Sequence, residues 1–315
     1  MTSYIIRRFF MVIPILIGAA TIVFALMFIV PGDPARLLMG QHGDEKTLAS
    51  IRHELGLDRP IYVQYGKFIG RLARGNLGVS YRQRRPVAEI IRERFPATAK
   101  LAVASMVIAV IFGIAAGIIA AVNRNTVLDW LVMVFSLTGI SMPVFWLGMM
   151  LILVFAAGLG WLPVGGYGRS GDLRHIILPA LSLAAVSVGY IARMMRSSML
   201  EVIGKDYIRT ARAKGLTSRA VILHHALRNA FIPVITIIGI NFASLLGGAV
   251  ATETVFAWPG LGRATVDAIR VRDLPVVEGC VMFLAFLFVI ANLLVDLSYA
   301  WLDPRIRLDG SSEGS

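Results

Sequence analysis

Six long apolar stretches dominate the pattern of hydrophobic and polar positions along the chain. A helix needs about 20 apolar residues to cross a hydrocarbon core of about 30 Å. Only helices and closed barrels satisfy their backbone hydrogen bonds within lipid, and these lengths are helical. The pattern therefore predicts an all-α integral membrane protein with six transmembrane helices. The stretches are 9–30, 101–122, 130–157, 176–192, 231–252 and 280–302.

Prolines and polar segments divide this pattern further. Pro143, Pro179 and Pro233 lie in or at the ends of apolar stretches, and we expect each to bend or begin a helix. The order of segments predicts four regions: an N-terminal tail with the first helix (1–30), an external segment with short helices (31–95), a five-helix transmembrane domain (96–302) and a C-terminal tail (303–315).

The external segment carries its own helix signals. Asp44 is a suitable N-cap for a helix ending near Gly56, and Pro60 opens a second helix that runs to Gly75. Residues 86–95 place apolar side chains on one side of a helix. That pattern fits a helix lying along the membrane surface and fits equally an ordinary surface helix of a small external subdomain. The apolar positions are Val87, Ile90, Ile91 and Phe95.

Composition and charge agree with the membrane class. Hydrophobic residues make up 57% of the chain and charged residues 16%, against about 25% charged in soluble domains. The net charge is +12, and the basic residues lie between the apolar stretches. This placement is typical of topology signals beside anionic lipid and not of a nucleic-acid surface. The segments that are cytoplasmic with the N-terminus inside carry more Lys and Arg than the short outer loops. Segment 31–95 is also basic, but long segments obey this rule poorly. We expect both termini in the cytoplasm.

The sequence offers no enzyme motif. It contains no G-x-x-x-x-G-K-[ST] phosphate loop, no H-E-x-x-H and no G-x-S-x-G. The first five apolar stretches lack acidic and basic residues altogether, and Cys280 reads as a small buried hydrophobe. Asp296 lies within the sixth stretch, where it is either a functional group or a hydrogen-bonding group that fixes helix packing. We expect no catalytic residue, cofactor or metal in this chain.

The loop at 193–230 is basic and patterned. Residues 206–215 predict a short helix stopped by Gly215. Ala211 and Gly215 are four residues apart, so we expect them to form a face of small residues that another surface approaches closely. A basic loop anchored to lipid headgroups is the alternative, but a short helix with a bare face favours docking into another protein.

This loop resembles the coupling loop of ABC-importer permeases of the dipeptide/oligopeptide/nickel family, nearest to B-type dipeptide permease subunits, with glutathione importer permeases second. Ala211, Gly215 and Leu227 fit the general importer motif, whereas Arg209 stands in place of its Glu. Five other segments carry the resemblance: P-G-D-P at 31–34, G-N-L-G-V-S at 75–80, R-P-V at 85–87, E-T-V-F-A-W-P-G-L-G at 253–262, and N-L-L-V-D at 292–296 followed by L-D-P-R-I-R at 302–307.

The resemblance implies a type I ABC importer permease fold in a bacterial inner (plasma) membrane. It implies a second homologous permease subunit, two cytoplasmic ABC ATPases that bind ATP and Mg²⁺, and a periplasmic or extracellular binding protein. A dipeptide or short peptide is the implied substrate, with glutathione, an oligopeptide or a nickel chelate as alternatives; a secondary transporter is a remote one. Membrane lipid is a partner, and nucleic acid is not. The implied ATPase-coupling residues are Arg209, Thr210, Ala211, Arg212, Lys214 and Gly215.

Weakly polar residues in the fourth and fifth stretches are candidates for a polar pathway. Small residues of this kind also mediate helix packing in membranes, and packing is the favoured interpretation. The candidate pore-lining residues are Ser182, Ser187, Thr236, Asn241 and Ser244.

Overall fold

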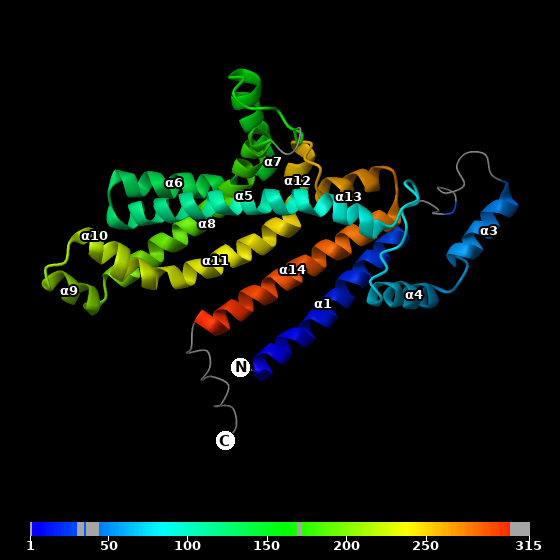
Figure 1. Ribbon diagram of the computed structural model, residues 1–315, viewed down its shortest axis with the longest axis horizontal. Coiled ribbons are helices and arrows are strands. Elements are labelled where there is room, and N and C mark those ends of the chain that lie inside the picture. The colour runs from blue at the N-terminus through cyan, green and yellow to red at the C-terminus, as the bar shows by residue number, and fades with distance from the viewer. Residues whose placement is uncertain (1, 30–34, 36–43, 169–171, 303–315) are drawn as a thin grey trace. The chain divides into compact units, whose positions relative to one another are not determined.

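A computed structural model describes residues 2–29, 35, 44–168 and 172–302 of the chain, and these residues are mostly helical (Figure 1). The helices are α1 (Thr2–Ile29), α3 (Glu45–Leu55), α4 (Ile61–Ala73), α5 (Val87–Val122), α6 (Val127–Ser141), α7 (Val144–Leu151), α8 (Leu173–Ile203), α9 (Asp206–Ala213), α10 (Ser218–Ala220), α11 (Leu227–Gly248), α12 (Val250–Val255), α13 (Leu261–Arg270) and α14 (Leu274–Leu302), with π-helical segments η2 (Ile152–Gly158) and η3 (Val221–Ala226).

The membrane spans appear largely where the apolar pattern predicts them. Within the described ranges, four helices are long and apolar enough to cross a membrane, and a bent pair brings the total to five. The first stretch is apolar over Phe10–Leu26 of α1, which is shorter. The predicted all-α membrane class is therefore confirmed, although α5 and α14 begin well before the apolar stretches they contain.

The third apolar stretch is not one continuous helix, so that part of the prediction is wrong. α6 ends at Ser141, and the helical segment Val144–Gly158 continues at an angle of 107° to it. Met142 is extended, with φ −79° and ψ 133°, because a residue before proline is disfavoured in the helical region. The predicted bend at Pro143 is confirmed. In contrast, α8 and α11 continue through Pro179 and Pro233.

The described chain forms two compact units. We call residues 2–98 with 259–289 the N-terminal unit, and residues 99–258 with 290–302 the core unit. α5 and α14 each pass from one unit to the other.

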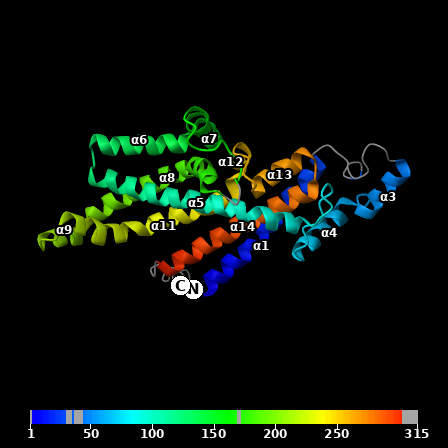
Figure 2. The ribbon, with the colours of Figure 1, turned by 45° about the horizontal axis from the view of Figure 1, so that its top comes forward.

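The core unit is organised around α8, which contacts α6, α7, α11 and α12. α5, α6, α8 and α11 lie side by side in two views (Figures 1 and 2). Small residues permit this close packing: a Cβ at Gly189 would lie 2.5 Å from the carbonyl oxygen of Ser136, and one at Gly117 would lie 2.6 Å from that of Ala192. Contacts between small residues are typical of helix pairs in lipid.

The core of the N-terminal unit includes the amphipathic face predicted at 86–95. These residues are the first turns of α5, which continues through Pro96. These residues therefore do not form a separate helix, and their apolar face is buried within the N-terminal unit. The face packs on α13 and α14 because burying both apolar surfaces removes them from water. The buried cluster consists of Val87, Ile90, Ile91, Leu261, Ala268, Val276 and Cys280.

The two short helices predicted for the external segment are present. The Asp44 side chain accepts a hydrogen bond from the backbone N–H of Thr47 at 3.0 Å, and α3 ends at Gly56 in the left-handed region, with φ 70°. Pro60 precedes α4. Both helix boundaries therefore follow from local capping chemistry.

Three of the sequence features lie wholly or partly outside what the structure describes. The P-G-D-P motif at 31–34 and residues 303–307 belong to the ranges that are not described. Asp296 lies in α14, but its side chain is outside the described side chains.

Candidate functional site

The predicted short helix in the basic loop is α9. Asp206 lies in its first turn, where a negative charge is favoured by the helix dipole. Gly215 follows the C-terminus with φ +81°, a left-handed conformation that glycine adopts without steric cost. The prediction that Gly215 stops this helix is confirmed.

Burial separates α9 into two faces. Ile208 and Ala211 are 0% and 7% exposed, and α9 contacts η3. At about 100° per residue, Arg209, Thr210 and Ala213 occupy the opposite face, and all three are exposed. The expectation that Ala211 lies on the approachable face is therefore wrong, because Ala211 is buried against its own chain.

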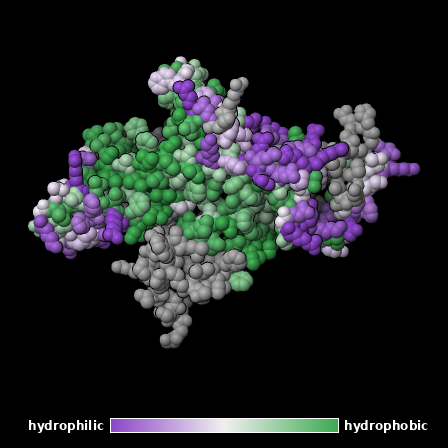
Figure 3. Space-filling model, viewed as in Figure 1, coloured by the Kyte–Doolittle hydropathy of each residue, from purple (hydrophilic) through white to green (hydrophobic). Residues whose placement is uncertain are grey.

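The exposed face of α9 is small and polar with basic edges. Ala213 lies near its centre, and Gly215 has open space around its Cα. Arg212 and Lys214 are exposed beside it. Figure 3 shows hydrophilic residues gathered at the α9–α10 end of the core unit. We call Arg209, Thr210, Arg212, Ala213, Lys214 and Gly215 the α9 surface.

The ion pairs around α9 leave its basic charge accessible. Arg209 lies 3.6 Å from Asp206, with the two side chains 79% and 96% exposed. Lys205 and Glu201 form a second exposed pair at 3.0 Å. Exposed pairs contribute only about 0–1 kcal/mol, so they give way easily to an acidic partner surface.

Two connections join α9 to the transmembrane helices. The side-chain amide of Asn229, in α11, donates a hydrogen bond to the hydroxyl of Tyr207 at 2.8 Å. η3 contacts α8, α9 and α11. Short π-helical segments occur often at functional sites. A displacement of α9 therefore has direct routes to α8 and α11.

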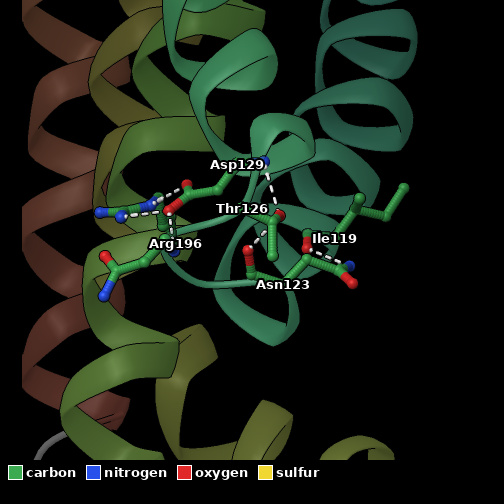
Figure 4. Close-up of polar contacts among 6 residues, drawn as sticks. Ile119, Asn123, Thr126, Asp129 and Arg196 are labelled. Atoms are coloured by element: carbon green, nitrogen blue, oxygen red, sulfur yellow. Dashed lines mark hydrogen bonds and ion pairs between the residues drawn. The ribbon is translucent and has the colours of Figure 1, made fainter.

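A buried ion pair in the core unit was not predicted from the sequence. Arg196 of α8 donates two hydrogen bonds to Asp129 of α6: Nε to Oδ1 at 2.6 Å and Nη2 to Oδ2 at 2.7 Å (Figure 4). The Asp129 side chain is 6% exposed and that of Arg196 is 26% exposed. Such a two-bond contact between a guanidinium and a carboxylate fixes direction as well as distance.

The turn between α5 and α6 holds Asp129 in place. Thr126 is the N-cap of α6, and its hydroxyl accepts from the backbone N–H of Asp129. The backbone N–H of Asn125, at φ 63°, donates to Asp129 Oδ2 at 3.0 Å. The Thr126-x-x-Asp129 spacing was a usable signal in the sequence, since it resembles a capping box. Nothing in the sequence identified Arg196 as the partner.

The candidate pore residues differ in exposure. Ser182 and Ser187 are 0% and 2% exposed, and the Ser187 hydroxyl donates to Asn241 Oδ1 at 3.4 Å. Burial within the chain favours the packing interpretation for these two serines. Thr236 and Asn241 are half-buried on α11, and Ser244 is exposed. Only α11 therefore presents candidate residues toward space outside this chain.

The segment 253–258 packs against the loop that follows η2 in the core unit. Glu253 and Trp258 are fully buried, and the Trp258 ring meets the Tyr167 ring edge-on, with centroids 4.8 Å apart. The backbone N–H of Gly166 donates to the carbonyl of Phe256 at 2.7 Å. The segment therefore anchors the loop that follows η2.

Metal-ligand chemistry is not assembled in the part of the chain that the structure describes. No group of three or more His, Cys, Asp or Glu side chains there is arranged to hold a metal ion. The arrangement instead combines apolar spanning helices with an exposed basic helix at one end.

Apolar helices packed through small residues around α8, with an exposed helix in the loop between two of them, define a polytopic helical membrane protein. The chain matches the family described as "binding-protein-dependent transport system inner membrane component" over residues 113–308 and its N-terminal component over residues 1–102. The chain belongs to this family.

The relatives share nearly the full length of the chain. The glutathione transport system permease protein GsiC of Escherichia coli O6:H1 is 47% identical over 98% of this chain and 99% of its own length. The dipeptide transport system permease protein DppB of Alkalihalophilus pseudofirmus is 41% identical over 98% of this chain and all of its own length. These values confirm the resemblance to dipeptide and glutathione permeases, although the glutathione permease, placed second from the motifs, has the higher identity of the two.

Solved structures show the same fold at low sequence identity. An inward-facing structure of the MetNI methionine ABC transporter aligns with 69% of this chain and 97% of its own, with a TM-score of 0.56 and 19% identity. An amino acid ABC transporter with histidines aligns with 68% of this chain, with a TM-score of 0.54 and 14% identity. The expected type I importer permease fold agrees with these alignments.

Proposed function

We propose that this chain forms one half of the translocation pore of an ABC importer for short peptides, including glutathione. The observation that carries the proposal is the full-length similarity to permeases named for glutathione and dipeptide transport. Glutathione is itself a short peptide, so one substrate class covers both relatives.

The proposed partners are a second homologous permease subunit, two cytoplasmic ABC ATPases and an external substrate-binding protein. The sequence has no phosphate loop, so the ATP and Mg²⁺ that drive transport would be held by the ATPases. The family description supports the binding protein, since it names binding-protein-dependent transport.

The α9 surface is the proposed contact with an ATPase. It is exposed, small at Ala213 and basic at its edges, whereas Ile208 and Ala211 hold the opposite face to the chain. ATP-driven closure of the ATPases would push α9, and the contacts of α9 with η3 and of Tyr207 with Asn229 would pass the movement to α8 and α11. Alternating access to the pore would follow.

The proposed pore surface lies on α11. Thr236, Asn241 and Ser244 are at least partly exposed there and offer hydroxyl and amide groups, which suit the peptide bonds of a substrate. Ser182 and Ser187 are left out because they are buried within the chain.

Thiol labelling of single cysteines tests the orientation that this proposal needs. In a Cys280→Ser background, Thr210→Cys should react with a membrane-impermeant maleimide only in inside-out vesicles. Trp161→Cys, at a position 64% exposed, should react in intact spheroplasts. Both termini would then be cytoplasmic. Labelling of position 210 from the outside would contradict the assignment of α9 to ATPase binding.

A further inference from the structure

The Asp129–Arg196 ion pair is largely enclosed within the core unit, with side chains 6% and 26% exposed. Charges are costly to place within a membrane protein unless they are paired. Here both carboxylate oxygens receive a guanidinium N–H, at 2.6 and 2.7 Å, and Oδ2 also accepts the backbone N–H of Asn125. Both carboxylate oxygens are therefore hydrogen-bonded, and the contact fixes the relative orientation of the two side chains.

The Asp129–Arg196 ion pair lies at the end of α8 that leads into α9. Arg196 lies about two turns before α8 ends at Ile203, and α9 begins at Asp206. Asp129 lies in the first turn of α6. The pair therefore ties the beginning of α6 to the part of α8 that is nearest in sequence to α9 (Figure 4).

Elsewhere the two helices approach closely through glycines. A Cβ at Gly139 would lie 2.9 Å from the carbonyl oxygen of Ala185, and Gly189 is even closer to α6. Apolar contacts resist separation of two helices but are not directional. The ion pair adds the directional contact, since a guanidinium fork fits a carboxylate in one plane.

We propose that Asp129 and Arg196 are positioning residues for energy coupling: their ion pair makes α6 move together with α8 when the ATPases displace α9. This inference rests on the proposed function. Without the pair, a push on α9 would still reach α8, but α6 would slide against it and the pore would open incompletely. ATP hydrolysis would then continue while substrate import falls.

A double variant separates this role from simple stabilisation. Removing one partner leaves an uncompensated buried charge and is strongly destabilising, whereas replacing a buried pair by apolar residues of similar volume is often neutral. Asp129→Leu with Arg196→Met therefore keeps the helices packed and removes the ion pair, together with the hydrogen bond from the Asn125 backbone N–H. Glu201→Gln, in the exposed Lys205–Glu201 pair on the same helix, is the matched control.

The measurement is the number of substrate molecules imported per ATP hydrolysed by the complete transporter in proteoliposomes. Radiolabelled glutathione and radiolabelled alanyl-alanine are each supplied with the binding protein, and the wild type is measured first. The absence of ATP-dependent import of either compound by the wild type would count against the proposed function and not against the ion pair.

The double variant should assemble with its partners and hydrolyse ATP, with import per ATP lowered by about tenfold, within the range typical of coupling between sites. The Glu201→Gln control should retain the wild-type ratio. An unchanged ratio in the double variant would overturn the proposal, because the pair would then contribute only stability.

Arg196→Lys keeps the test decisive if the double variant does not assemble. Lysine retains the charge but cannot form the two-bond fork, so import per ATP should fall while assembly is retained. A wild-type ratio in Arg196→Lys would likewise overturn the proposal.

Discussion

Replacement of Ala213 by Trp should abolish ATP-dependent import while the chain still inserts and pairs with its second permease subunit. Ala213 lies near the centre of the exposed face of α9, so an indole there would hold an ATPase away from the helix. Import should fall below about a tenth of the wild-type rate, since a tenfold loss requires only about 1.4 kcal/mol of contact free energy. Co-purification of the ATPases with a tagged permease measures the lost contact directly.

Arg212→Glu is the comparison for this variant. Arg212 is exposed at the edge of the same surface, and an exposed charge pair contributes about 0–1 kcal/mol. Its effect should therefore be the smaller of the two. If Arg212→Glu removed the ATPases and Ala213→Trp were tolerated, the α9 surface would bind through charge and the account based on close packing would be wrong.

Gly189→Leu should destabilise the core unit more than any surface substitution. A Cβ at this position would lie 2.5 Å from the Ser136 carbonyl oxygen and 2.7 Å from Ile140, so α6 and α8 would have to separate. Overpacking of this kind costs about 1–3 kcal/mol and sometimes more. The thermal midpoint of the detergent-solubilised transporter should therefore fall. It is measured as the temperature at which half of the monodisperse protein is lost.

Gly204→Leu provides the matched control for Gly189→Leu. Gly204 follows the end of the same helix and is exposed, and the nearest atom to a Cβ there is the Glu201 carbonyl oxygen at 3.5 Å. Its thermal midpoint should stay close to that of the wild type. Equal losses in both variants would show that close α6–α8 packing is not what makes position 189 sensitive.

Features set by local chemistry could be predicted from the sequence. The apolar stretches follow from length and composition, and the boundaries at Asp44, Gly56 and Gly215 follow from capping residues. Family membership followed from motifs distributed along the chain, and the family matches confirm it.

Features set by packing could not be predicted in the same way. Pro143 gave the position of the bend in the third stretch, but its 107° angle depends on what the two helices contact. The continuity of α5 through Pro96 likewise depends on packing and not on local sequence. The spacing of Ala211 and Gly215 indicated one approachable face of small residues, but Ala211 is buried, because the face of α9 that packs inward depends on η3.

The Asp129–Arg196 pair could not be predicted from the sequence. The two residues are 67 positions apart in the chain, and ion-pair partners at such separation leave no periodic signal. In the structure, Ala192 and Met199 are fully buried and lie one turn from Arg196 on its face of α8. An arginine on a buried helix face requires a partner.

Reconstituted import tests the central claim most directly. The complete transporter, with its second permease, both ATPases and binding protein in proteoliposomes, should accumulate radiolabelled glutathione or alanyl-alanine only when ATP and Mg²⁺ are present on the ATPase side. Omission of the ATPases should abolish accumulation. Accumulation of either peptide by this chain alone, driven by an ion gradient without ATPases, would contradict its assignment as the pore subunit of an ATP-driven importer.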